Sequence, residues 1–144
     1  MDEAAYRQKF AEVVARPCVF EKALLAGCVA CECAQRKQIA EREAATCREA
    51  ASHFRCHELH HSLRHSFAFA LGKMHDEEVL PHAQEMRVQC GGLKGLQQVL
   101  SGGPDVDDVD ALAANALRQW GDWAGIPWSE VVHAAAQCYK GRHG

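Results

Sequence analysis

The residues in this sequence that are most able to carry out chemistry are its cysteines, of which there are eight in 144 residues. Six of them lie in one stretch, at positions Cys18, Cys28, Cys31, Cys33, Cys47 and Cys56. The pair best spaced to share a metal is Cys28 and Cys31, in the run Cys-Val-Ala-Cys. In a reducing compartment, clustered cysteines are more often metal ligands or redox groups than disulfides. The pattern therefore predicts a small metal-thiolate protein.

An iron-sulfur cluster is the leading hypothesis, because such a cluster needs several thiolates that converge on one small volume. A four-iron four-sulfur cluster is the form we expect. The expected ligands are Cys18, Cys28, Cys31 and Cys90, with Cys47 and Cys56 as alternates or as a second site. The function that follows is electron transfer or redox sensing, and a carrier or sensor is favoured over a catalyst.

Local sequence supports the two outer ligands of this set. Two glycines follow Cys90, so the backbone there can approach a cluster closely, and exposed amides near a helix start favour a thiolate. Cys18 comes directly after a proline, which ends the preceding helix and places the thiol at a bend. We interpret Cys33 and Cys138 as small buried apolar side chains, since free cysteine is among the most buried residue types.

The spacing matches no regular ferredoxin run, and the sequence has no second Cys-x-x-Cys of the zinc-ribbon kind. Two other functions therefore stay open. A helical bundle with core-facing thiols could store or deliver copper(I), which thiolates bind well. Alternatively, the protein could be an interaction module that a zinc ion stabilises. Cys90 acting as a catalytic nucleophile with a histidine base is a minor hypothesis.

The elements that must position these cysteines are predicted to be helices, because apolar residues recur at spacings of three and four throughout. The fold class that follows is all-α, a single domain over 1–144 with five or six helices. The cysteine-rich metal-binding region would cover 18–56 and be completed by Cys90. Over 20–46, good helix formers predominate, and Gly27 leaves two geometries open. Either a short helix ends at Gly27 and the following cysteines form a loop, or one helix continues through them.

Composition places the chain among ordinary globular proteins, with 48% apolar residues, 24% charged residues and a formal net charge of -3. Acidic and basic residues alternate along the chain, so nucleic acid is not an expected partner. A protein redox partner is expected instead. No apolar run reaches the length of a membrane span, and the first residues do not follow the pattern of a signal peptide. The expected location is the cytoplasm.

Overall fold

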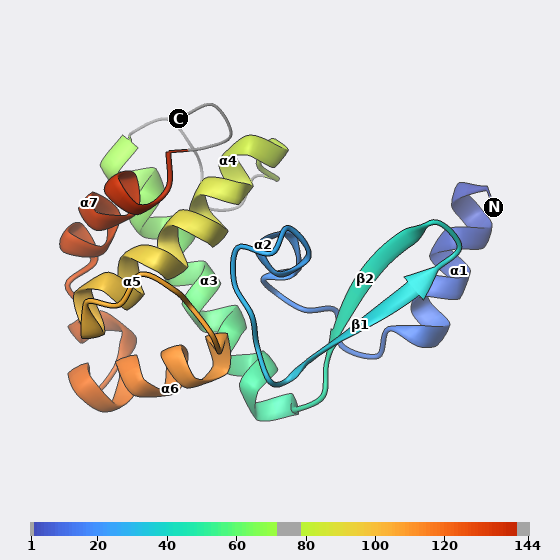
Figure 1. The fold of residues 1–144 in the computed structure, drawn as a ribbon, viewed down its shortest axis with the longest axis horizontal. Helices are drawn as coiled ribbons and strands as arrows, with labels where there is room; N and C mark the ends of the chain where they lie inside the picture. The colour runs from blue at the N-terminus through green and yellow to red at the C-terminus, as the bar shows by residue number, and fades with distance from the viewer. Residues whose placement is uncertain (1, 72–78, 141–144) are drawn as a thin grey trace.

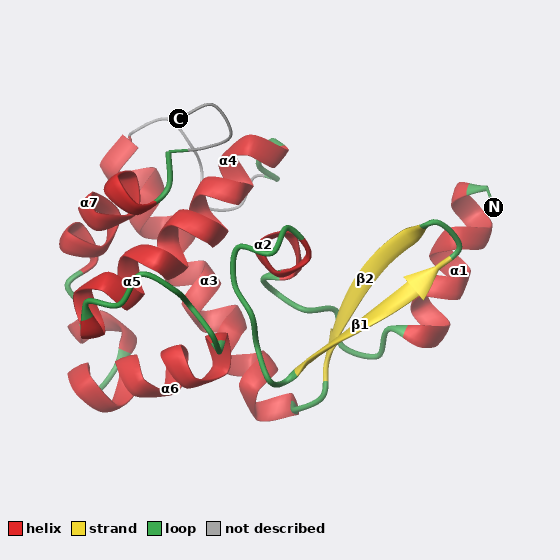
Figure 2. Cartoon of the chain, in the orientation of Figure 1, coloured by secondary structure: helices red, strands yellow, loops and turns green. Residues whose placement is uncertain are grey.

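The longest helix, α3 (Ala50–Leu71), runs through the centre of the helical part of the chain, as Figure 1 shows. The computed structural model describes residues 2–71 and 79–140, and most of them are helical (Figure 2). Segment 72–78, expected to belong to a polar linker, lies outside the described residues. Around α3 are the helical elements α2 (Glu21–Leu25), α4 (His82–Met86), the π-helical η1 (Arg87–Gly91), α5 (Gly92–Ser101), α6 (Val109–Trp120), the 3-10 turn η2 (Trp123–Gly125) and α7 (Trp128–Cys138).

The main core lies where α3 meets the later helices. Leu59, Leu63 and Phe67 recur along one face of α3 and are buried, as the helical periodicity predicts. Helices α5 and α7 approach each other closely at Gly95, where even a methyl group would meet the backbone of α7. The three tryptophans, Trp120, Trp123 and Trp128, are partly buried against this core.

A smaller core lies beside the first, under the N-terminal helix α1 (Glu3–Val13). Its stripe, Tyr6, Phe10 and Val13, packs on Ile39 and Ala44 of a two-stranded hairpin. Figure 1 shows α1 and this hairpin extending together away from the helical body. The Arg42 guanidinium lies 4.2 Å from the ring centroid of Tyr6 and also pairs with Glu3, which holds the end of the hairpin against α1.

The hairpin corrects the all-α prediction. Strands β1 (Ala34–Ile39) and β2 (Arg42–Cys47) pair antiparallel in the segment for which helix formers predicted helix. Helix propensity is weak, and tertiary packing overrides it here, because the hairpin buries Ile39 and Ala44 under α1. The turn between the strands contains Ala40 at φ 56°, a conformation more typical of glycine or asparagine, so no turn signal appears in the sequence.

The choice left open at Gly27 resolves in favour of a loop. Helix α2 ends at Leu25, Gly27 takes a φ of +78°, and the next cysteines lie in a loop that leads into β1. Backbone hydrogen bonds tie this loop to the start of α6, from Ala30 N–H to Val106 O and from Val109 N–H to Ala30 O, each 3.0 Å. Among the described residues, no helix combines the length and apolar character needed to cross a membrane.

Candidate functional site

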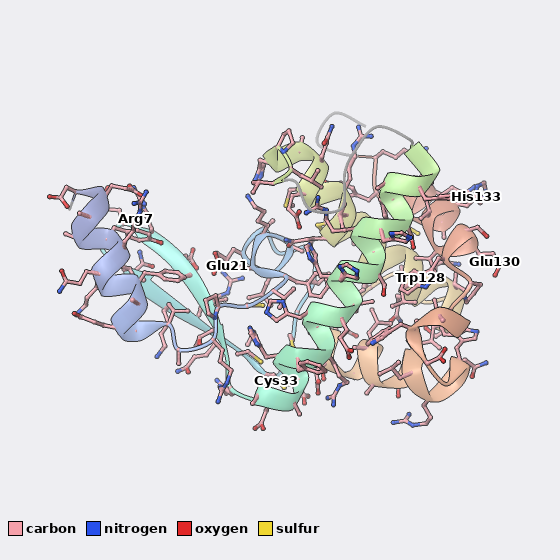
Figure 3. All side chains as sticks on the ribbon, turned by 180° about the vertical axis from the view of Figure 1, so that it is seen from behind. Arg7, Glu21, Cys33, Trp128, Glu130 and His133 are labelled. Atoms are coloured by element: carbon pink, nitrogen blue, oxygen red, sulfur yellow. A yellow bond between two sulfur atoms is a disulfide. The ribbon has the colours of Figure 1, made fainter. Side chains whose placement is uncertain are left out.

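Five cysteines line one small pocket between the hairpin, the loop after α2 and the first half of α3. We call this cavity the thiol pocket. Its cysteines come from four places in the chain: Cys18 before α2, Cys31 and Cys33 in the loop, Cys47 at the end of β2, and Cys56 on α3. Figure 3 labels Cys33 at the point where the hairpin meets the N-terminal end of α3. All five thiols are free.

Backbone hydrogen bonds between these segments hold the cysteines around the pocket. Cys18 N–H donates to Ala45 O at 2.9 Å, and Cys47 N–H donates to Arg16 O at 2.8 Å, so the segment before α2 runs beside β2. On the other side, Arg48 N–H donates to Cys33 O at 2.8 Å. The pocket is therefore built from the main chain of elements that are distant in sequence.

The lining of the thiol pocket is apolar apart from the thiols and the side chains of Ser52, His53 and Asp110. Among the described residues, no lysine or arginine lines it. The carboxylate of Asp110 accepts a hydrogen bond from Arg55 at 2.8 Å. The cavity volume is about 20 Å³. In the arrangement of the described residues, no three His, Cys, Asp or Glu side chains converge closely enough to form a metal-ion site.

Burial favours the protonated form of four of these thiols, those of Cys18, Cys31, Cys33 and Cys56, because it raises the pKa of each. It raises the pKa of Cys18 to about 11 and that of Cys31 to about 12. Burial also raises the pKa of Cys56, and the negative charges that Cys31, Cys18 and Cys47 would carry as thiolates raise it further. Cys47 Sγ donates to Glu49 O at 3.3 Å. With no lysine or arginine in the described lining, a bound metal cation would balance the negative charge of several thiolates in this pocket.

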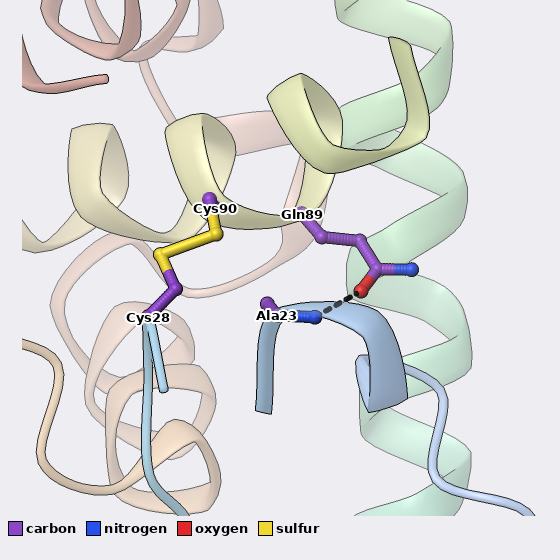
Figure 4. The surroundings of a disulfide bond; sticks show 4 residues. All are labelled: Ala23, Cys28, Gln89 and Cys90. Atoms are coloured by element: carbon purple, nitrogen blue, oxygen red, sulfur yellow. Dashed lines mark hydrogen bonds between the residues drawn. A yellow bond between two sulfur atoms is a disulfide. The ribbon is translucent and has the colours of Figure 1, made fainter. Parts of the chain in front are cut away.

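The other two cysteines of the predicted ligand set lie in a second place. Cys28 and Cys90 form a disulfide, with Cα atoms 6.0 Å apart (Figure 4). Cys28 is half-buried in the loop after α2, whereas Cys90 is fully buried. Cys90 belongs to η1, a π-helical turn, and such turns are frequent at functional sites. The sequence offered no signal for this π turn.

A buried polar chain holds the two sides of the disulfide together. Ala23 N–H of α2 donates to Gln89 Oε1 at 3.0 Å, as Figure 4 shows. Gln89 Nε2 in turn donates to Glu85 Oε2 at 2.8 Å, and His60 Nε2 lies 2.7 Å from the same oxygen. Gln89 and Glu85 are both buried. The residue next to Cys90 thus anchors the helix that leads into Cys28.

The hydrogen bonds to Glu85 make the stability of the fold depend on pH. Burial acts to raise the pKa of Glu85, but hydrogen bonds from His60 and Gln89 outweigh it and hold the pKa below its ordinary value. The stabilisation is present above the ordinary carboxyl pKa and is lost as pH falls through the lowered one.

We expect Glu85→Gln to cost about 1–3 kcal/mol at neutral pH and to flatten the loss of stability between about pH 5 and about pH 3. Urea unfolding over this range measures both effects. Glu43→Gln, at an exposed pair with Arg36, is the control and should leave the acid dependence unchanged.

The structure thus divides the predicted ligands between two places. Cys18 and Cys31 lie in the thiol pocket with the two alternates, Cys47 and Cys56, and Cys28 and Cys90 lie together in the disulfide. Cys33, expected to be a buried apolar side chain, is only partly buried and belongs to the pocket lining. Its Sγ donates to Ser52 Oγ at 3.6 Å. Cys138, also expected to be buried, is only partly buried and lies at the end of α7, outside both groups.

No known protein family, curated protein or solved structure matches this chain.

Proposed function

We propose that the thiol pocket binds a single thiophilic metal ion, copper(I) before any other, and that the protein stores or delivers this ion. The observation that carries the proposal is that five free thiols from four chain segments line one apolar cavity. Packing alone has no need for so many sulfur atoms in one place. Thiolates select soft metals, and copper(I), zinc and iron-sulfur clusters are the groups that they bind.

The size of the cavity favours one ion over a cluster. A cavity needs roughly 10–15 Å³ to hold one water molecule, and the thiol pocket offers about 20 Å³. A four-iron four-sulfur cluster fills a far larger space, so the helices and the hairpin would have to separate to admit it. One metal ion needs only that the thiol side chains rotate toward a common point.

The cost of making thiolates favours copper(I) over zinc. Metal binding must displace the thiol protons, and the pKa values of Cys18, about 11, and Cys31, about 12, make each displacement costly. Structural zinc almost always takes four protein ligands. Copper(I) is held by fewer thiolates, so fewer protons leave and less negative charge stays in the apolar pocket.

Anaerobic purification and metal analysis test this proposal. The expected result is binding of one copper(I) per chain in competition with a chromophoric copper(I) chelator, without acid-labile sulfide. A protein that fails to compete for copper(I), or that competes equally well when the pocket thiols are blocked by alkylation, overturns the proposal. Stoichiometric zinc whose removal unfolds the chain would assign a structural zinc site instead. Iron with equivalent sulfide would assign the cluster, with electron transfer or redox sensing as the function.

A further inference from the structure

The disulfide between Cys28 and Cys90 opens onto a basic cleft. The cleft has a volume of about 720 Å³, within the range of small-molecule sites. Both cysteines line it, together with the cationic side chains Arg87 of η1, Lys94 of α5 and Lys140 after α7. His82, at the start of α4, lies at the same cleft. Three separate elements therefore direct positive charge toward one disulfide.

This charge is local, because the whole chain has a formal net charge of -3. Among the described residues, no carboxylate belongs to the lining of the cleft, and none forms an ion pair with Arg87, Lys94 or Lys140. Basic side chains without acidic partners in a concave site attract anions and raise their local concentration. The molecule to be expected beside the disulfide is consequently negatively charged.

We propose that Cys28 and Cys90 form a redox-active disulfide that exchanges with a small anionic thiol bound in this cleft. The site is separate from the thiol pocket and does not depend on a metal there. The class of substrate is a low-molecular-weight thiol that carries one or more carboxylates. Its carboxylates would pair with the basic side chains, and its sulfur would reach the disulfide.

Exposure decides which sulfur the substrate attacks. Cys90 is fully buried, whereas Cys28 is half-buried and reachable from the cleft. The substrate thiolate bonds to Cys28 Sγ, the S–S bond breaks, and Cys90 leaves with the electron pair as a thiolate that takes up a proton. A second substrate thiolate then attacks the substrate sulfur of this mixed disulfide and releases Cys28. Two thiols are oxidised to one disulfide, and the protein disulfide is reduced to two thiols.

The surrounding structure keeps the reduced cysteines together, which makes the exchange reversible. Two contacts hold the Cys28 side without help from the disulfide: Ala23 N–H donates to Gln89 Oε1 at 3.0 Å, and Cys28 N–H donates to Ala23 O at 2.9 Å. Because Gln89 adjoins Cys90, breaking the S–S bond leaves the two sulfur atoms near each other. A purely structural cross-link would not need an open cleft beside it.

The test compares thiols of different charge as reductants of the full chain. Mercaptopropionate, mercaptoethanol and cysteamine are anionic, neutral and cationic, and each rate is divided by the thiolate concentration to remove differences in thiol pKa. Rapid quenching by alkylation and mass spectrometry follow Cys28 and Cys90. We expect the anionic thiol to react about tenfold faster than the neutral one at low salt, the cationic thiol to be slowest, and the differences to shrink as salt screens the charges.

Matched variants separate the cleft from the overall charge. Lys94→Gln combined with Lys140→Gln should remove most of the preference for the anionic thiol. Lys9→Gln combined with Lys37→Gln removes the same charge from α1 and the hairpin, which extend away from the helical body, and should preserve the preference. Equal normalised rates for the three thiols, or a preference that survives loss of the cleft lysines, would overturn the inference. Copper(I) binding in the thiol pocket is measured separately on the same variants. The proposal of disulfide exchange and the proposal of copper(I) binding can therefore fail independently.

Discussion

Replacing Gly95 by alanine is expected to destabilise the protein by about 3 kcal/mol, although alanine is the better helix former. Gly95 lies within α5, where a methyl group would stand 2.5 Å from Val131 O and 2.8 Å from Ala135 N. Both atoms belong to the backbone of α7, so no side-chain rotation can relieve the contact. The two helices must separate, and the fully buried residues around them lose their packing. Thermal unfolding should show a decrease in Tm of roughly 10 °C.

Gly91→Ala is the matched control, because Gly91 precedes Gly95 by one turn and faces the same helix. A methyl group at Gly91 would lie 3.5 Å from Tyr139 Cβ and 3.6 Å from Ala135 Cβ, which are ordinary contacts. This variant should be neutral or more stable by up to about 1 kcal/mol, because alanine loses less backbone entropy. Equal effects at the two positions would contradict the close approach of α5 and α7.

The helices of this fold could be predicted from the sequence where apolar residues repeat on one face. Helix α1 begins after Asp2, whose side chain accepts a hydrogen bond from Ala5 N–H at 2.7 Å, and it ends at Val13, shortly before Pro17. Helix α6 begins after Asp108, and Gly121 ends it. The hairpin could not be predicted in this way, because its residues favour helix and its stability comes from packing under α1.

The sequence predicted that cysteines form the candidate site, but it did not predict which cysteines lie together. Cysteine density identified the region, yet spacing along the chain does not reveal that Cys31 and Cys56 share a pocket while Cys28 faces Cys90. The division depends on the loop after Gly27, which directs Cys28 and Cys31 to different sides. Buried Val29 lies between them as part of the main core. Only two residues lie between Cys28, which forms the disulfide, and Cys31, which lines the thiol pocket. The Cys-x-x-Cys pattern does not indicate this division.

Cys56→Ser is expected to lower the affinity of the thiol pocket for copper(I) by on the order of 100-fold or more, since losing a residue that merely supports a metal ligand can already cost roughly 100-fold. Cys56 lines the pocket with the other four cysteines, and the charges that Cys31, Cys18 and Cys47 would carry as thiolates raise its pKa beyond the effect of burial. Serine has nearly the same size as cysteine, so the fold should remain intact, but its oxygen is a poor ligand for a soft ion. Cys138→Ser removes a thiol outside the pocket and should leave the affinity unchanged.

Proton release distinguishes a lost ligand from an indirect effect of Cys56→Ser. At neutral pH the thiols of Cys18 and Cys31 are protonated, since burial raises the pKa of Cys18 to about 11 and that of Cys31 to about 12. Every thiol that becomes a ligand must release its proton, so the affinity should rise about tenfold per pH unit for each such thiol. Calorimetry in buffers of different ionisation enthalpy counts these protons. If Cys56 is a ligand, the serine variant releases about one proton fewer on binding copper(I), and its affinity depends less steeply on pH. An unchanged proton count with a reduced affinity would show that Cys56 only supports the pocket.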